Sequence, residues 1–144
     1  MNEKSNFESN IQDTKNATVP RILIIEDNAL NLEVLSILLN MMGLKCDQAT
    51  SGHAALILST NNIYDLVLMD LQMPDMDGFE TCRRIRSDAT PNQNCKIVAV
   101  TAHVGPEWHQ RSIDAGMNDF LSKPIRRESL ATIIKKHTGY ESPA

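Results

Sequence analysis

Hydrophobic residues in this chain gather in short continuous runs, separated by longer stretches in which they recur every three or four positions. Three runs are apolar throughout, which is typical of strands buried on both faces of a parallel sheet: Ile22–Ile25, Leu66–Met69 and Ile97–Val100. Two shorter segments, Lys45–Ala49 and Phe120–Ser122, are predicted to be the remaining strands.

The stretches between these runs carry helix signals. Asn28–Met42 is followed by Gly43, which suits the left-handed conformation that often ends a helix. The segment Asp77–Glu80 has the spacing of a capping box. Pro106 suits the first turn of a helix that continues to Ala115.

The last helix is predicted from Leu130, Ile133, Ile134 and His137, which fall at i, i+3, i+4 and i+7, and Gly139 marks its end. Strands and helices therefore alternate along the chain. This order predicts an α/β fold of the (βα)₅ type, a doubly wound sheet of five parallel strands.

Composition sets the domain organisation. The chain has 144 residues, of which 42% are hydrophobic, enough for one core. Residues 1–19 are polar without a sustained period and are predicted to form a mobile arm. The folded domain is expected over residues 20–138, with a short tail at 139–144.

Charge and cysteine content exclude several classes of function. A formal net charge of -4 without a basic stripe argues against direct binding of nucleic acid. Cys46, Cys82 and Cys95 form no CxxC pair and suit reduced, mostly buried thiols. No signal peptide is recognisable and no apolar run approaches the roughly 20 residues of a membrane span, so a cytoplasmic protein without membrane contact is expected.

Polar side chains stand where the predicted strands end. Asp70 follows Val67-Leu68-Met69, the pair Glu26-Asp27 follows the first strand, and Thr101 and Lys123 follow two later ones. Because ligands of open parallel sheets bind in the crevice at the carboxyl ends of the strands, these groups are expected to converge there.

Three carboxylates in one crevice repel each other and require a cation. Hard oxygen ligands suit Mg²⁺, which commonly binds through one or two carboxylates together with a phosphate. Lys123 and Thr101 would add a positive charge and a hydroxyl donor for a phosphoryl group in transfer. An aspartate with its ordinary pKa of about 3.9 is ionised at neutral pH, so Asp70 could act as the nucleophile without a general base.

Four motifs carry a resemblance to one family: Glu26-Asp27, Met69-Asp70-Leu71-Gln72-Met73-Pro74-Asp75-Met76-Asp77-Gly78, Val100-Thr101-Ala102 and Lys123-Pro124. Together they resemble the receiver domain of two-component response regulators, over roughly residues 20 to 138 and most closely the receivers that serve hybrid histidine kinases. The resemblance implies the flavodoxin-like form of the fold and a cis bond between Lys123 and Pro124.

The resemblance also implies roles for individual residues. Asp70 would accept the phosphoryl group, and Mg²⁺ would be held by Asp70, Asp27, Glu26 through water and the backbone carbonyl of Gln72. Thr101 and Lys123 would complete the catalytic set, with Thr101 and Phe120 as the switch pair. Further positions are implied at the rim of the site (Gln72, His103) and in docking of a histidine kinase or phosphotransfer domain (Ala29, Leu30, Pro124, Ile125).

Other interpretations of single motifs are weaker. The Asp75-Met76-Asp77 motif is similar to the start of haloacid dehalogenase-type phosphohydrolases, but Pro74 and Gly78 favour a turn, with Asp77 as a helix cap. An EF-hand would require an acidic residue where Met73 stands. A binding module that works without phosphorylation would normally lack one of the site residues, and all are present.

The expected function is a phosphorylation switch with autodephosphorylation, not an enzyme of many turnovers. Only four residues follow Tyr140, and Met1 resembles an initiator, so the sequence favours a free-standing regulator that signals through a downstream protein. A phosphorylation-dependent homodimer is also possible. A receiver segment of a hybrid kinase remains the alternative, with an aspartate-based phosphohydrolase behind it.

Overall fold

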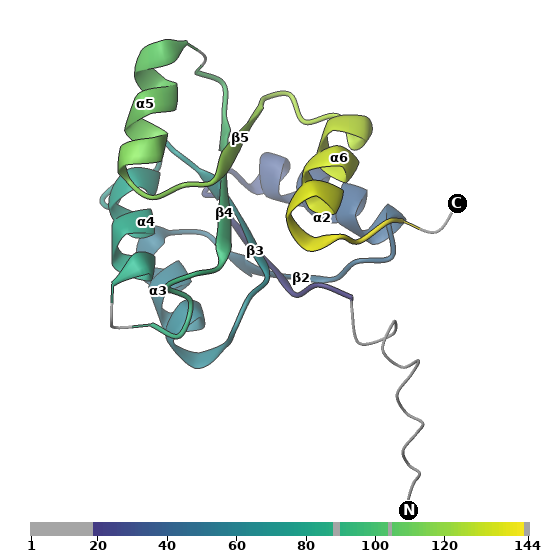
Figure 1. The fold of residues 1–144 in the computed structure, drawn as a ribbon, viewed down its shortest axis with the longest axis horizontal. Helices are drawn as coiled ribbons and strands as arrows, with labels where there is room; N and C mark the ends of the chain where they lie inside the picture. The colour runs from purple at the N-terminus through teal and green to yellow at the C-terminus, as the bar shows by residue number, and fades with distance from the viewer. Residues whose placement is uncertain (1–18, 88–89, 104, 143–144) are drawn as a thin grey trace, which may run out of the picture.

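The computed structural model describes residues 19–87, 90–103 and 105–142. Five strands and five helices alternate along this part of the chain (Figure 1). Their bounds are β1 (Ile22–Ile25), α2 (Ala29–Met41), β2 (Cys46–Ala49), α3 (Gly52–Asn61), β3 (Leu66–Asp70), α4 (Gly78–Arg86), β4 (Lys96–Thr101), α5 (Pro106–Asp114), β5 (Asp119–Ser122) and α6 (Arg127–Thr138).

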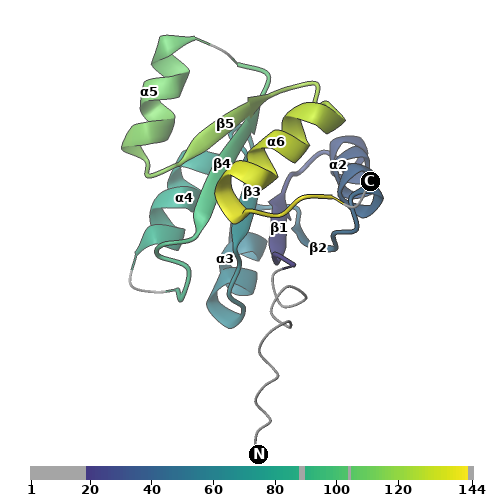
Figure 2. The same ribbon diagram turned by 45° about the vertical axis from the view of Figure 1, so that its right-hand side comes forward.

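The strands form one parallel sheet in the order β2-β1-β3-β4-β5. Helices α3, α4 and α5 cover one face of the sheet, and α2 and α6 cover the other (Figures 1 and 2). This is the doubly wound, flavodoxin-like topology, and the predicted fold class is confirmed. The strand order reverses between β1 and β3, which is where such sheets bind ligands.

The central strands are buried on both faces, which explains their continuous apolar runs. Leu23 and Ile25 pack in the core on the α3–α5 side, whereas Ile22 and Ile24 pack on the α2–α6 side. Alternate residues of a strand point to opposite faces, so each run supplies both cores. Burying one such side chain contributes about 1.5–3 kcal/mol, and the burial fixes the register of the strands.

Helix α2 begins and ends by the local rules that its sequence indicates. The side chain of Asn28 accepts a hydrogen bond from the backbone N–H of Asn31 (2.9 Å) and caps the first turn. Gly43 has a φ of 81°, and the N–H groups of Gly43 and Leu44 donate to the carbonyls of Asn40 and Leu39. These paired bonds form a Schellman motif, so the predicted end at Gly43 is confirmed.

The predicted capping box at the start of α4 forms only in part. Asp77 caps the helix, because its carboxylate accepts a hydrogen bond from the N–H of Glu80 (2.9 Å). The side chain of Glu80 does not return the bond; it pairs instead with Arg83 (3.2 Å) and Arg84 (2.9 Å) along the helix surface. The arginines of the same helix are the closer partners for this carboxylate.

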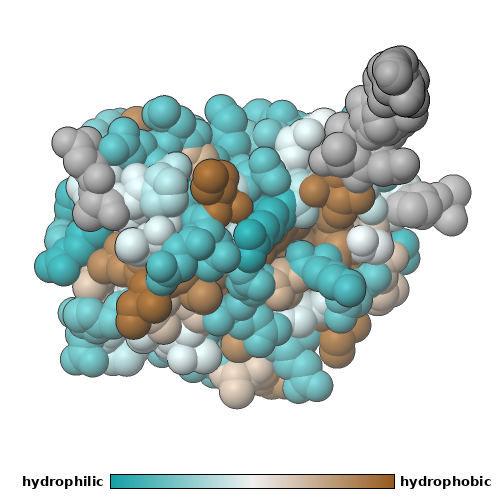
Figure 3. All heavy atoms as spheres, turned by 90° about the horizontal axis from the view of Figure 1, so that it is seen from below, coloured by the Kyte–Doolittle hydropathy of each residue, from teal (hydrophilic) through white to brown (hydrophobic). Residues whose placement is uncertain are grey.

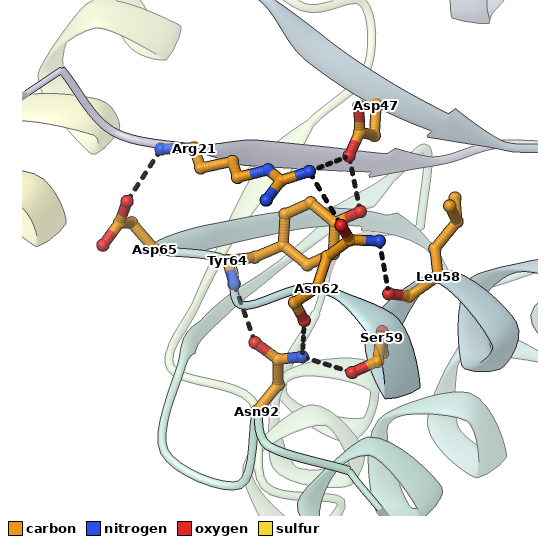
Figure 4. Close-up of polar contacts among 8 residues, drawn as sticks. All are labelled: Arg21, Asp47, Leu58, Ser59, Asn62, Tyr64, Asp65 and Asn92. Carbon is orange, nitrogen blue, oxygen red and sulfur yellow. Dashed lines mark hydrogen bonds and ion pairs between the residues drawn. The ribbon is translucent and has the colours of Figure 1, made fainter.

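At the amino ends of the strands a polar network ties the base of the sheet together (Figure 4). Asn92 accepts a hydrogen bond from the N–H of Tyr64 (2.8 Å) and donates to the carbonyls of Ser59 (2.7 Å) and Asn62 (2.8 Å). Viewed from below, towards these ends of the strands, the surface shows separate hydrophobic patches among hydrophilic residues (Figure 3).

The predicted N-terminal arm lies almost entirely outside the described residues, and the predicted C-terminal tail lies partly outside them. Of the arm expected over residues 1–19 the structure describes only Val19, and of the tail expected over 139–144 it describes residues 139–142.

The cysteines carry free thiols: Cys82 is buried, Cys46 and Cys95 are partly exposed. Burial raises the pKa of the Cys82 thiol to about 11, which suits an unreactive core residue.

Candidate functional site

The register of the sheet brings the predicted site residues together. Ile25 of β1 pairs with Met69 of β3, so the residues that follow them, Glu26 and Asp70, come level at the carboxyl edge of the sheet. Thr101 ends β4 and pairs with Ser122 of β5, which places Lys123 one residue beyond. Four separate segments of the sequence therefore meet at the predicted crevice.

Glu26, Asp27 and Asp70 form an acidic cluster in which one carboxylate oxygen from each lies within 4.8 Å of the others. Glu26 and Asp70 are only 3% and 6% exposed, whereas Asp27 is exposed. One oxygen of Glu26 accepts a hydrogen bond from the N–H of Asn28 (3.1 Å). The cluster thus presents two buried carboxylates and one that faces solvent.

Lys123 bridges the two buried carboxylates. Its Nζ lies 3.2 Å from Oε1 of Glu26 and 3.5 Å from Oδ1 of Asp70. The Lys123–Pro124 peptide bond is cis, as the resemblance implied. The N–H of Lys123 donates to the carbonyl of Thr101 (2.8 Å), which holds the start of this turn against the end of β4.

The environment of Asp70 works against its ionisation. Burial raises the pKa of this carboxyl above its ordinary value, and the negative charge of Glu26 raises it further. Lys123 and the N–H of Gln72, which donates to Asp70 Oδ1 at 3.2 Å, oppose the rise. The sequence suggested an aspartate with its ordinary pKa, but the pKa of Asp70 in the folded protein is raised. A further cation beside Asp70 would lower this pKa again.

Thr101 is buried, and its hydroxyl oxygen accepts a hydrogen bond from the N–H of His103 (2.9 Å). The predicted rim residue His103 does not simply overhang the crevice, because its ring stacks on Trp108 of α5. The other predicted rim residue, Gln72, is exposed two residues after Asp70, and its N–H donates to the Asp70 carboxylate.

Phe120 on β5 lies in an outward position, with 37% of the residue exposed. Its ring meets that of His109 edge to face, with centroids 5.0 Å apart. A small cavity of about 20 Å³ lies between Phe120, Thr101 and Trp108. Both members of the predicted switch pair, Thr101 and Phe120, therefore line one small cavity.

The turn after β3 confirms that Asp75 and Asp77 have structural tasks. Asp75 adopts a left-handed conformation with φ of 68°, and Asp77 caps α4. A Cβ on Gly78 would collide with the carbonyl oxygen of Asp70 and come within 2.9 Å of the Cα of Leu71. Only glycine allows α4 to start this close to the end of β3.

The predicted docking residues lie on one side of the crevice. Ala29, Leu30 and Pro124 are exposed, Leu30 at 68%, whereas Ile125 packs partly against the core on the α2–α6 side. Three further apolar residues of α2 are also exposed at the surface: Val34, Ile37 and Met41.

Sequence reasoning missed the aromatic group on the opposite side of the crevice. Trp108 stacks with both His103 and Phe79, and the guanidinium of Arg111 lies over the rings of Phe79 and Trp108. The spacing of Trp108 and Arg111 on α5 was a signal for one shared helix face, but nothing local linked that face to Phe79.

The donor set fits Mg²⁺. Three carboxylates supply hard oxygen ligands within a few ångströms. Burial, and then the negative charge of Glu26, raise the pKa of Asp70, and a divalent cation nearby would oppose both effects. Asp27 and Asp70 are the residues suited to hold such an ion directly. Glu26 and Asp70 each also have Lys123 and a backbone N–H group as partners.

Comparison with known proteins agrees with this geometry. Residues 22–135 match the family model described as the response regulator receiver domain, so the chain belongs to the receiver-domain family. Receiver domains of phosphorelays are phosphoacceptor switches that interact with histidine kinases or phosphotransfer proteins, and they are generally not enzymes of many turnovers.

Two relatives are histidine kinases. The chain is 40% identical over 122 residues to hybrid signal transduction histidine kinase L of Dictyostelium discoideum, covering 81% of this chain and 7% of the relative. It is 37% identical over 130 residues to sensor histidine kinase GacS of Pseudomonas protegens, covering 89% and 14%. The chain thus spans only a small part of the length of these relatives.

A solved structure similar to this chain contains a magnesium ion. The receiver domain of sensor histidine kinase PA1611 from Pseudomonas aeruginosa, which has a magnesium ion coordinated in its active site cleft, aligns with a TM-score of 0.76. It is 33% identical, and the alignment covers 84% of this chain and 98% of that one.

In the part of this chain that the structure describes, no helix is long and apolar enough to cross a membrane.

Proposed function

We propose that this receiver domain, expected over residues 20–138, accepts a phosphoryl group on Asp70 from a phosphohistidine. The observation that carries the proposal is the position of Asp70: a buried carboxylate at the end of β3, beside Lys123 and two further carboxylates. A structural carboxylate buried to this degree would be expected to have enough donors to lower its pKa, and that of Asp70 is raised.

In the proposed transfer a carboxylate oxygen of Asp70 forms the bond to phosphorus while the phosphorus–nitrogen bond to the donor imidazole breaks. The electron pair of that bond stays on the imidazole nitrogen. Lys123 and the hydroxyl of Thr101 stabilise the charge on the phosphoryl oxygens. Mg²⁺, held by Asp27, Asp70 and the carbonyl of Gln72, and by Glu26 through water, would supply further positive charge to those oxygens when bound.

The same groups serve the return reaction. Water attacks phosphorus, the bond to Asp70 breaks, and inorganic phosphate leaves, which restores the carboxylate. Between the two steps Thr101 and Phe120 act as the proposed switch, and both side chains line the same small cavity. The face formed by α5 and α6, reshaped by this switch, is the proposed contact for a downstream protein or a second copy.

Intact-mass measurement tests the acceptor directly. After incubation with acetyl phosphate and Mg²⁺ the protein should gain one phosphoryl group, and Asp70→Asn should gain none. Chelation of Mg²⁺ should suppress the gain in the wild-type protein. An unchanged gain in Asp70→Asn would overturn the assignment.

The donor protein is proposed to dock on the start of α2 and the turn after β5, through Ala29, Leu30, Pro124 and Ile125. These residues adjoin the crevice, and Leu30 is the most exposed large apolar residue among those described. An exposed apolar group beside a reactive site is suited to bind a partner that delivers the phosphoryl group.

Leu30→Asp should slow transfer from the cognate phosphohistidine protein about 10-fold or more, because it places a charge in an apolar contact. Ile57→Asp on α3 is the matched control, since Ile57 is 65% exposed on the other face of the sheet. Both variants should accept phosphate from acetyl phosphate at the wild-type rate. Equal transfer rates from the donor protein would remove Leu30 from the docking surface.

The setting of the domain is the second part of the proposal. Its relatives contain this domain within much longer kinases, which favours a receiver segment of a hybrid kinase over the free-standing regulator inferred from the sequence. Detection of the native polypeptide with an antibody to this domain separates the two. A band near 16.1 kDa indicates the free regulator, and a much larger one the kinase segment.

A further inference from the structure

An aromatic stack joins three elements beside the phosphoacceptor crevice. The His103 ring, in the loop after β4, lies 4.3 Å from the Trp108 ring of α5 with an interplanar angle of 10°. Trp108 in turn stacks on Phe79 of α4, with centroids 5.9 Å apart and an angle of 29°. The Arg111 guanidinium lies 4.2 Å from the Phe79 centroid and 5.2 Å from that of Trp108.

The stack holds a residue that contacts the catalytic hydroxyl. The N–H of His103 donates a hydrogen bond of 2.9 Å to the hydroxyl oxygen of Thr101. A threonine hydroxyl has two acceptor lone pairs and one proton. With one lone pair occupied by this bond, the proton of Thr101 must point away from the His103 N–H and is available for another acceptor.

We propose that Trp108 is a positioning residue for phosphoryl transfer, acting through the His103 ring on the orientation of the Thr101 hydroxyl. The inference rests on the proposed function, in which that hydroxyl donates to a phosphoryl oxygen. Trp108 fixes the ring, the ring fixes the backbone of His103, and the backbone N–H orients the hydroxyl. Phe79 and Arg111 also contact the Trp108 ring, so the position of Trp108 does not depend on His103 alone.

The test compares Trp108→Leu, which removes the stack, with Trp108→Phe, which keeps an aromatic surface. Phosphorylation of the full chain by acetyl phosphate at saturating Mg²⁺ should slow about 3- to 10-fold in Trp108→Leu, the range expected for loss of one aromatic pair. The loss should fall on the limiting rate, with the half-saturating acetyl phosphate concentration unchanged. Trp108→Phe should recover most of the rate, and Ile113→Ala on the same helix should match wild type.

A double-mutant cycle distinguishes positioning from general support of the fold. In a Thr101→Ala background Trp108→Leu should cause no further loss, because the hydroxyl on which it acts is gone. His103→Ala, which removes the ring and keeps the N–H, should lose rate as Trp108→Leu does, and the two losses should not add. This second variant keeps the test open if Trp108→Leu fails to fold.

Two results would overturn the inference: a wild-type rate in both Trp108→Leu and His103→Ala, or an equal loss with and without the Thr101 hydroxyl. Failure of the proposed function looks different. In that case the wild-type protein itself gains no phosphoryl group, or gains one at a residue other than Asp70.

Discussion

Both ends of the sheet carry clustered carboxylates, but these carboxylates are well paired with donors at the amino end and only partly paired at the carboxyl end. At the amino end Asp47 accepts hydrogen bonds from the Tyr64 hydroxyl (2.6 Å) and Arg21 Nη2 (3.2 Å), and Asp65 accepts one from the Arg21 N–H (2.7 Å). Arg21 also lies over the Tyr64 ring (Figure 4). Each carboxylate of this end has donors supplied by its neighbours.

At the carboxyl end Glu26, Asp27 and Asp70 share Lys123 as the cation that bridges two of them. Asp27 forms no ion pair or side-chain hydrogen bond with any of the described residues. The negative charges of the amino end are therefore balanced by donors within the protein. Those of the carboxyl end need a further cation to balance them. The repulsion among the carboxylates of the carboxyl end opposes folding, while the carboxylates of the amino end are well paired. Selection for stability alone would have removed this repulsion, so its presence indicates a functional site.

The largest expected effect separates the metal cluster from the neighbouring turn. Asp27→Ala removes an exposed carboxylate that has no other task and should weaken Mg²⁺ binding by about 100-fold, at the upper end of the losses seen when even outer-shell partners are removed. Asp75→Ala should change it little, because Asp75 belongs to the turn after β3. Isothermal titration with Mg²⁺ measures both. Similar losses in the two variants would restore the Asp75–Asp77 motif as a metal site.

A smaller effect is expected from breaking the polar network at the amino end of the sheet. Asn92→Ala leaves the N–H of Tyr64 and the carbonyls of Ser59 and Asn62 without their partner, which should cost about 2 kcal/mol of unfolding free energy. Urea denaturation measures the loss, and the exposed Asn94 in the same turn provides the control variant Asn94→Ala. Phosphorylation by acetyl phosphate should be unchanged, so a matching loss of phosphorylation would show that the two ends are not independent.

The smallest expected effect is a change in the unfolding free energy that has opposite signs in Asp70→Asn and Asp47→Asn. Without Mg²⁺, Asp70→Asn should raise the unfolding free energy at pH 7 by about 0.5–2 kcal/mol, because it removes a charge that the folded state opposes. Asp47→Asn should lower it by about 1 kcal/mol, because a charge-assisted acceptor is lost. Thermal unfolding in a chelating buffer compares them. Destabilisation by Asp70→Asn would show that Asp70 is structurally compensated like Asp47.

The pH dependence of that difference follows from the raised pKa of Asp70. Folding favours the protonated carboxyl, so the stability due to this group is fully present below its unfolded pKa and is lost as pH rises through its folded pKa. Wild type and Asp70→Asn should therefore approach equal stability as pH falls below the ordinary aspartate range. A stability difference between wild type and Asp70→Asn that widens as pH falls would show that folding lowers the pKa of Asp70 instead of raising it.

Much of the fold could be predicted because each element carries its own local signal. Continuous apolar runs indicated strands buried on both faces, and Gly43, Pro106 and Gly139 marked helix ends where the structure has them. The convergence of Glu26, Asp27, Asp70 and Lys123 followed from strand ends and parallel topology. These inferences need only patterns within one segment and the general geometry of parallel sheets.

What could not be predicted depends on contacts between segments. The partners of Glu80 were decided by competition between a backbone N–H and two arginines of the same helix. The stacking of His103 on Trp108 depends on the path of the loop after β4, which no periodicity describes. The raised pKa of Asp70 also required the structure, because it results from burial and from the distance to Glu26.

The assignment of Asp70 as the phosphoacceptor is tested most directly by locating the acyl phosphate. Borohydride reduction of the protein phosphorylated with acetyl phosphate and Mg²⁺ releases phosphate and converts a phosphorylated aspartate into homoserine, which peptide mass spectrometry can place in the sequence. We expect homoserine at position 70 and at none of the carboxylates of the amino end. Homoserine at position 27, 75 or 77, with Asp70 unmodified, would contradict it.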